Sequence, residues 1–305
     1  MGKRLALSGI AVMSLASQLA LADGFLGADQ GKLHLTAGFS TLEGAGGGGL
    51  TPWAFITGYG SDESWGANAF ATEVLLRDVE LRSFGAAVGV LDRFELSYSR
   101  QELEFFDGPL DQVGVSLDTF GVKVRVFGNA VYAQDTWLPQ VAVGAQFKRH
   151  GGVEGLEGLG ITSVEQLGAG DTDGIDYYVS ATKLSLSMNF LLNVTVRATQ
   201  ANQLGLLGFG GSNRPNGEDR YYAEFETTIA YLLTRKLAIG GEYRTRPDNL
   251  NVDEEAAAWD AFIAWTPSKY VSILGAYANI GALLGPQTQD TSDQDGGYLS
   301  IQVGF

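Results

Sequence analysis

The chain of 305 residues carries 35 acidic and 20 basic side chains, a formal net charge of −15, and no cysteine. This charge argues against nucleic acid as a partner, because phosphates are met by Lys and Arg. Without cysteine there is no disulfide, zinc–thiolate site or thiol nucleophile, and we expect no cofactor. Glycine, at 42 residues, is about twice as frequent as average. Most of these glycines fall in alternating segments, as in β-barrels.

Residues 1–22 have the pattern of a secretory signal peptide. Lys3 and Arg4 precede an apolar run, and Ala20-Leu21-Ala22 forms a small-x-small cleavage site. The run is too short, and too interrupted by polar residues, to span a membrane as a helix. No later stretch has eighteen consecutive apolar residues, so the mature chain either is soluble or crosses a membrane as strands.

Residues 23–53 come next, and we expect them to form a periplasmic or plug segment. Their apolar stretch, residues 33–39, is either an extra strand or a segment that stays in the periplasm or enters the lumen. The second interpretation is favoured because it keeps the strand count even. The GAGGGG run at 44–49 lacks the Lys-Ser/Thr pair of a phosphate loop, since Leu50-Thr51-Pro52 follows it. It therefore predicts a flexible or tightly folded turn.

Residues 54–305 alternate apolar and polar side chains with a period of two, which is typical of half-exposed strands. The last ten residues place Leu299, Ile301, Val303 and Phe305 on one face, and a terminal aromatic is typical of outer-membrane barrels. The phase of the segment 177–185 stays open. We predict twelve strands near residues 54–60, 83–90, 93–101, 117–127, 138–148, 176–185, 189–199, 220–232, 236–245, 256–265, 269–280 and 296–305.

The connections alternate in length. Short turns are expected near 91–92, 186–188, 233–235 and 266–268, with a slightly longer one at 128–136. Long loops are expected at 61–82, 102–116, 149–173, 200–219, 246–255 and 281–295. This asymmetry is typical of a bacterial outer-membrane barrel with its long loops outside and both chain ends in the periplasm.

Aromatic residues are expected to anchor the barrel at the membrane interface. Trp53, Trp137 and Trp265 each fall at the periplasmic end of a predicted strand, on its apolar face, and Phe305 closes the chain. A belt of interfacial aromatics is typical of membrane barrels.

Charged residues on the opposite face are expected to line the lumen, where they tune selectivity. They are Glu95, Lys123, Arg125, Lys148, Arg197, Glu224, Glu226, Glu242 and Arg244. In the hairpin around residues 233–235, a register in which paired numbers sum to 468 sets Arg244 opposite Glu224 and Glu242 opposite Glu226. Two alternatives stay open: these charges line a narrow channel, or they brace one another across a closed interior.

Five runs of sequence carry a family resemblance: GGGGLTPWAFITGYG at 46–60, QDTWLPQVAVG at 134–144, DYYVSATKL at 176–184, ANQLGLLGFGG at 201–211 and GEYRTRPDNL at 241–250. Together they resemble a family of uncharacterised Gram-negative proteins, defined as a domain of unknown function and taken to be outer-membrane proteins. The resemblance covers nearly all of the mature chain. It implies a location but no substrate and no functional residues.

Catalysis is not expected. Some outer-membrane barrels hydrolyse lipids with a serine and a histidine, but His34 and His150 do not fall mid-strand on the outer face beside a serine. The clustered carboxylates of the long loops match no calcium loop, so we interpret them as solvated and expect no metal site.

The sequence therefore predicts an all-β protein: a transmembrane, antiparallel, up-and-down barrel in the outer membrane of a Gram-negative bacterium. The expected function is a narrow channel or facilitator for a small solute. The alternative is a plugged structural or interaction barrel that presents acidic loops. The expected partners are outer-membrane lipid and lipopolysaccharide, and the barrel-assembly machinery through the C-terminal strand.

Overall fold

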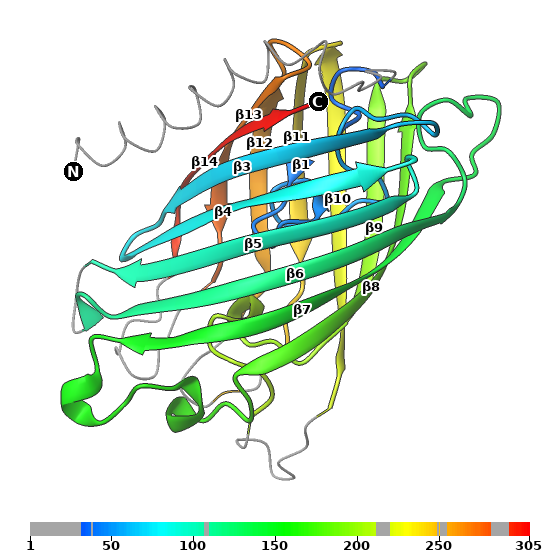
Figure 1. The fold of residues 1–305 in the computed structure, drawn as a ribbon. Helices are drawn as coiled ribbons and strands as arrows, with labels where there is room; N and C mark the ends of the chain where they lie inside the picture. The colour runs from blue at the N-terminus through cyan, green and yellow to red at the C-terminus, as the bar shows by residue number, and fades with distance from the viewer. Residues whose placement is uncertain are drawn as a thin grey trace.

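The structure, a computed structural model, describes residues 32–37, 39–106, 110–211, 220–248, 250, 255–281 and 293–305. The predicted signal peptide lies outside these residues. Twelve antiparallel strands close into one barrel, in which each pairs with its neighbours along the chain and β14 pairs with β3 (Figure 1). The expected twelve-stranded, up-and-down transmembrane barrel is confirmed. None of the helices in the described residues is long and apolar enough to cross a membrane.

The barrel strands are β3 (Trp65–Leu75), β4 (Val79–Val90), β5 (Phe94–Phe105), β6 (Gly114–Phe127), β7 (Gln140–Glu154), β8 (Asp173–Ser185), β9 (Phe190–Thr199), β10 (Tyr222–Thr234), β11 (Leu237–Arg244), β12 (Ala258–Trp265), β13 (Val271–Asn279) and β14 (Asp295–Gly304). Two short strands, β1 (Phe39–Ser40) and β2 (Gly46–Gly47), pair with each other. Three 3₁₀ helices, η2 (Glu157–Leu159), η3 (Val164–Leu167) and η4 (Gln203–Gly205), lie in the loops.

The first barrel strand is not the predicted one. Residues 54–60 form no strand, and β3 instead occupies part of the expected loop 61–82. The alternation of large apolar and polar residues does not reveal β3. Its outward face carries the small residues Ala67, Ala69 and Ala71, while Phe70 faces the lumen. The strand count is right because one predicted strand is lost and another gained.

The two ends of the barrel differ. One, here the short-turn end, holds the connections 91–93, 128–139, 186–189, 235–236 and 266–270, together with the C-terminus (Figure 1). Leu91 and Asp92 both have positive φ, as a tight turn between twisted strands requires. The other, the long-loop end, carries the 3₁₀ helices, but its β3–β4 connection is only residues 76–78. The predicted asymmetry therefore holds except at this connection and at 128–139, which is longer than the connection 106–113 of the long-loop end.

An apolar belt surrounds the barrel. Its outward side chains are exposed to the surroundings, as Leu96, Val122 and Ile263 are. Aromatic pairs lie on the same outward face toward the long-loop end: Tyr98–Phe120, Tyr177–Tyr221 and Trp259–Tyr277. An apolar exterior edged by aromatic residues is the surface that lipid requires of a spanning barrel.

Beyond the belt, toward the long-loop end, the polarity of the strands inverts. On the outward face of β5, Phe94, Leu96 and Tyr98 give way to Arg100, Glu102 and Glu104. On its lumen face, the polar Ser99 and Gln101 give way to the buried Leu103 and Phe105. The barrel thus continues past the membrane with a charged exterior and an apolar interior. This is why the expected loops 102–116 and 149–173 are partly strand.

The inversion predicts how strand β5 tolerates a new charge. Leu96→Arg, within the belt, is expected to lower the free energy of unfolding by about 3 kcal/mol, and Glu104→Arg, on the same face beyond it, by less than about 1 kcal/mol. Urea titration of both variants in lipid vesicles measures the difference. Equal losses would contradict the position assigned to the edge of the belt.

Candidate functional site

Residues 32–37 and 39–60 form a segment that enters the barrel, and we refer to it as the plug (Figure 1). Its short hairpin pairs Phe39 with Gly47 and Ser40 with Gly46. From residue 39 to residue 60 every side chain is buried. The described part of the segment expected in the periplasm or the lumen is therefore in the lumen, and none of the described residues within 33–39 belongs to a strand of the barrel. The plug extends past the expected boundary at residue 53 because residues 54–60 belong to it.

The glycine-rich run brings the plug backbone against barrel carboxylates. A Cβ atom on Gly48 would lie 2.0 Å from Glu242 Oε1, and one on Gly46 would lie 2.8 Å from Glu95 Oε2. Gly44 has φ +88°, a conformation that side chains disfavour. The run is thus a tightly folded turn in which glycine permits close approach to the wall.

Glu242 on β11 holds this turn. Its Oε2 accepts hydrogen bonds from the backbone N–H groups of Gly49, at 2.6 Å, and Leu50, at 2.7 Å. Its Oε1 accepts from the hydroxyls of Thr51, at 2.6 Å, and Thr228, at 2.8 Å. Hydrogen bonds to a charged acceptor are about twice as strong as neutral ones, so Glu242 fixes the position of the turn.

Glu95 and Lys123 hold the plug on the opposite side of the turn. The two side chains form an ion pair at 3.0 Å. Glu95 accepts from the N–H groups of Gly46 and Thr57, each at 2.9 Å. Lys123 donates to the carbonyls of Gly46, at 2.7 Å, and Phe55, at 3.0 Å. One wall ion pair therefore satisfies four backbone groups of the plug.

A cluster of seven charged side chains lies at the centre of the lumen, and we refer to it as the central ion cluster. Its cations are Lys148, Arg197 and Arg244, and its carboxylates are Glu43, Asp176, Glu224 and Glu226. Glu43, from the plug, contacts all three cations: Lys148 directly, Arg197 Nη2 at 3.1 Å and Arg244 Nη1 at 2.8 Å.

The wall members of this cluster are bonded to one another as well. Arg197 Nε lies 2.6 Å from Glu226, Lys148 Nζ lies 2.6 Å from Asp176, and Arg244 Nε lies 3.0 Å from Glu224. Burial alone would raise the pKa of Glu43, but Arg197, Arg244 and Lys148 outweigh it and hold that pKa well below its usual range. Of the two alternatives for the lumen charges, the arrangement matches the bracing network.

Eight of the nine predicted lumen residues are buried inside the barrel. Arg125 is the exception: it lies near the short-turn end, where its Nη1 is 2.5 Å from Asp92, which also pairs with Lys32 of the plug at 2.7 Å. Sequence reasoning missed Glu43 and Asp176. Asp176 lies in the strand whose phase was left open, and nothing local marks Glu43 except its position beside the glycine run.

The predicted hairpin register is wrong by two residues. Arg244 is paired with Glu226, and Glu242 with Thr228, so paired numbers sum to 470 rather than 468. The side of the sheet to which each side chain points is nevertheless predicted correctly, because a register shift of two residues leaves every residue on the same face. Arg244 still reaches Glu224 along the diagonal, and the expected repulsion does not arise because Thr228, not Glu226, lies opposite Glu242.

The four aromatic residues predicted at the membrane interface lie in different environments. Trp53 is 4% exposed and lies in the plug, where its Nε1 donates to Thr228 Oγ1 at 2.8 Å, so its assignment to the membrane interface is wrong. The sequence around Trp53 alternates as a strand does, but Trp53 belongs to no strand. Trp137 is 75% exposed and Trp265 points outward. Phe305 packs edge-to-face on Trp65 at 5.0 Å. Interfacial anchoring by these three residues stays a prediction.

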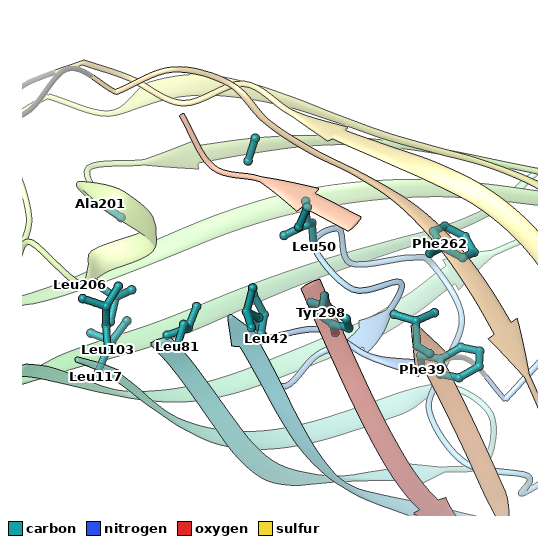
Figure 2. Packing of buried hydrophobic residues seen from close by; sticks show 14 of the residues in the cluster. Phe39, Leu42, Leu50, Leu81, Leu103, Leu117, Ala201, Leu206, Phe262 and Tyr298 are labelled. Atoms are coloured by element: carbon teal, nitrogen blue, oxygen red, sulfur yellow. The ribbon is translucent and has the colours of Figure 1, made fainter. Parts of the chain in front are cut away.

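Above the plug, toward the long-loop end, lies a cavity of about 450 Å³ that we refer to as the apolar chamber. Leu42 and Leu50 of the plug form one side of it, and Figure 2 shows them beside Leu81, Leu103 and Tyr298 of the barrel wall. Loop residues including Leu206 close it from the long-loop end. The chamber results from the inverted polarity of the strands.

The two histidines lie in different places, His150 on β7 and His34 in the plug. His150 Nε2 lies 2.9 Å from the carbonyl oxygen of Leu206, and its Nδ1 accepts from the N–H of Gly152 at 2.9 Å. Both ring nitrogens are thus engaged with backbone. Burial, together with the charges of Lys236 and Lys269, lowers the pKa of His34 in the plug. The engagement of both nitrogens leaves His150 without a free nitrogen for a serine hydroxyl.

The fold and its filled lumen define a plugged transmembrane β-barrel. The chain belongs to the family described as "Protein of unknown function (DUF3034)", whose model matches residues 36–302. No curated protein matches it.

Solved barrels share the general architecture. The NanC porin structure is 6% identical, with a TM-score of 0.49, covering 78% of this chain and 98% of that one. The KdgM porin is 7% identical, with a TM-score of 0.46, covering 78% and 99%. Outer membrane phospholipase A from Escherichia coli is 9% identical, with a TM-score of 0.40, covering 81% and 94%. At these values neither a channel nor an enzyme is implied for this chain.

Removing the charge of Glu43 is expected to loosen the plug. Glu43→Gln loses charge-assisted bonds to buried cations, at a cost of about 2 kcal/mol. The local opening equilibrium of the plug should rise about 30-fold, seen as faster hydrogen exchange at the amides of Gly49 and Leu50. Glu63→Gln, at an exposed position, is the matched control and should leave exchange unchanged. Unaltered protection in Glu43→Gln would show that the cluster does not hold the plug.

The same group sets a pH dependence. The folded pKa of Glu43 is depressed, so its stabilisation is fully present above the unfolded pKa of about 4.3 and is lost as pH falls toward the folded pKa. The difference in plug protection between wild type and Glu43→Gln should therefore be constant from neutral pH to about 5 and shrink only below about 4.3. Exchange measurements corrected for intrinsic rates test this, and a difference that disappears near neutral pH would contradict it.

Proposed function

We propose that this protein is an outer-membrane barrel of a Gram-negative bacterium that passes a small solute only when its plug is displaced. The signal-like start, the apolar belt and the short turns at one end support this location, with the short-turn end toward the periplasm. The function is gated transport rather than an open narrow channel.

The plug is the observation that carries this proposal. It fills the lumen between the central ion cluster and the short-turn end and is bonded to wall charges on both sides. A single hydrogen bond to a charged group contributes about 1.5–3 kcal/mol, which lowers the open population about 10- to 100-fold. Several such bonds act together here, so spontaneous opening is rare.

The charged side chains of the barrel wall balance one another without the plug. Without Glu43, the central ion cluster holds three cations and the three carboxylates Asp176, Glu224 and Glu226, which pair among themselves. Departure of the plug thus leaves a charge-balanced polar surface that water can solvate. A wall that depended on Glu43 for neutrality would oppose opening more strongly.

A plugged structural barrel is the second candidate function. It is favoured by the extent of the bonding between plug and wall, which includes the backbone from Gly46 to Thr57. Neither candidate function requires catalysis, and the engagement of both His150 nitrogens with backbone supports this choice.

Planar-bilayer recording distinguishes these functions through Gly48. In Gly48→Ala the new methyl group collides with Glu242 Oε1, 2.0 Å away, and the carboxylate must move from the position in which it holds the turn. We expect a silent wild type and brief openings in Gly48→Ala, at least tenfold more frequent. Gly158→Ala is the control because nothing lies within 4 Å of its Cβ position.

A third variant that lacks residues 23–60 should give steady conductance. Steady steps from the wild type would contradict a closed plug. Silence from all variants, with the barrel shown to be folded, would refute gated transport and leave the structural function.

A further inference from the structure

The apolar chamber has the size and lining of a small-molecule site. Its volume of about 450 Å³ lies within the roughly 300–1,000 Å³ of ligand cavities. Leu, Val, Ile, Ala and Phe side chains make up nearly all of the lining, and the exceptions are Gln166, Gln203, Arg244, Arg246 and Tyr298. A polar solute would lose its hydration here without replacement bonds, so the chamber selects hydrophobic molecules.

Most of the polar side chains that line the chamber already form hydrogen bonds within the protein. Gln166 accepts from the N–H groups of Thr162 and Ser163 and donates to the carbonyl of Gly160. Arg246 donates to Gln203 and to the carbonyls of Ala256 and Ile280. These groups brace the loops that close the chamber, and their hydrogen-bonding capacity is directed away from a ligand.

Tyr298 and Arg244 differ from these groups. The hydroxyl of Tyr298 is buried without a hydrogen-bond partner among the described residues, and the same holds for one donor of Arg244. Arg244 Nε donates to Glu224 at 3.0 Å and its Nη1 to Glu43 at 2.8 Å, but its Nη2 is buried and has no hydrogen-bond partner among the described residues. The residue is 1% exposed and lines the chamber. A buried donor without a hydrogen bond costs about 1–3 kcal/mol of stability, and an acceptor atom on a bound ligand would remove this cost.

We propose that the apolar chamber binds an uncharged hydrophobic molecule with one terminal oxygen that accepts a hydrogen bond from Arg244 Nη2. The inference rests on the proposed function, because it names the substrate class of that transport. An alkanol or a hydrophobic ketone has this chemistry. An anionic head group fits less well, since the central ion cluster already has four carboxylates against three cations.

The apolar chamber is also in contact with the plug, which closes the barrel. Leu42 and Leu50 belong to the plug, and Leu42 precedes Glu43, which accepts from Arg244. A molecule bound in the chamber therefore touches both the plug and one of the cations that hold it. This contact gives a hydrophobic ligand a direct route to the plug.

The test uses the full-length mature protein in lipid nanodiscs, equilibrated with radiolabelled dodecan-1-ol and counted after gel filtration. Leu103→Trp fills the chamber, and Glu104→Trp, the next residue on the outward face, is the matched control for partition into lipid. We expect binding above empty nanodiscs for wild type and Glu104→Trp, and at least a tenfold loss for Leu103→Trp. Ala278→Met, a smaller filling change in the same lining, guards against misfolding and should also weaken binding.

Ligand chemistry tests the role of Arg244. Dodecan-1-ol should bind at least fivefold more tightly than dodecane, which has no acceptor, and than dodecanoate, which is charged. Arg244→Lys keeps a cation beside Glu43 and Glu224 but lacks Nη2, so it should lose the preference for the alcohol over dodecane while still binding both. Equal binding in wild type and both filling variants, or no alcohol preference in wild type, would overturn the proposal.

These outcomes are separable from those of the bilayer recordings. Binding in the chamber without openings in Gly48→Ala would refute gated transport and leave the ligand site intact. Openings without chamber binding would leave gated transport and refute the substrate class.

Discussion

The contact of Glu43 with three buried cations is the interaction on which the rest of the structure depends. It sets the depth at which the plug lies, because Lys148, Arg197 and Arg244 project from three different strands toward one carboxylate. Charges removed from water are stabilised only by close partners, so the plug has a single favourable position. The turn from Gly46 to Leu50 is then brought within reach of Glu95 and Glu242.

The position of the plug divides the lumen into a filled region and an open one. Toward the short-turn end the plug fills the lumen: Thr195 donates to the carbonyl of Pro52 at 2.8 Å, and apolar wall residues such as Leu184 and Leu191 lie beside Phe39 and Trp53. Toward the long-loop end the wall becomes apolar and the plug presents only Leu42 and Leu50. The chamber lies in this second region, where the described residues of the plug contribute only these two side chains to its lining.

The inverted polarity of the strands makes this division compatible with one continuous barrel. A strand within lipid must be apolar outside, whereas a strand beyond lipid can be charged outside and apolar inside. On β5 the change falls between Tyr98 and Leu103 without any break in the ladder to β4 and β6. One set of strands therefore builds both a membrane-spanning wall and an enclosed hydrophobic site.

The sequence by itself determined the barrel, eleven of its twelve strands, its apolar exterior and eight of its lumen charges, because these follow from a local period of two. Only the tertiary structure decided the pairing register, the identity of the first strand, the plug and the chamber. The bond from Gly49 to Glu242 joins residues 193 apart in the chain, and no local pattern encodes such a contact. Trp53 shows the same limit: its neighbours alternate as a strand does, but burial in the lumen, not pairing in the wall, fixes its place.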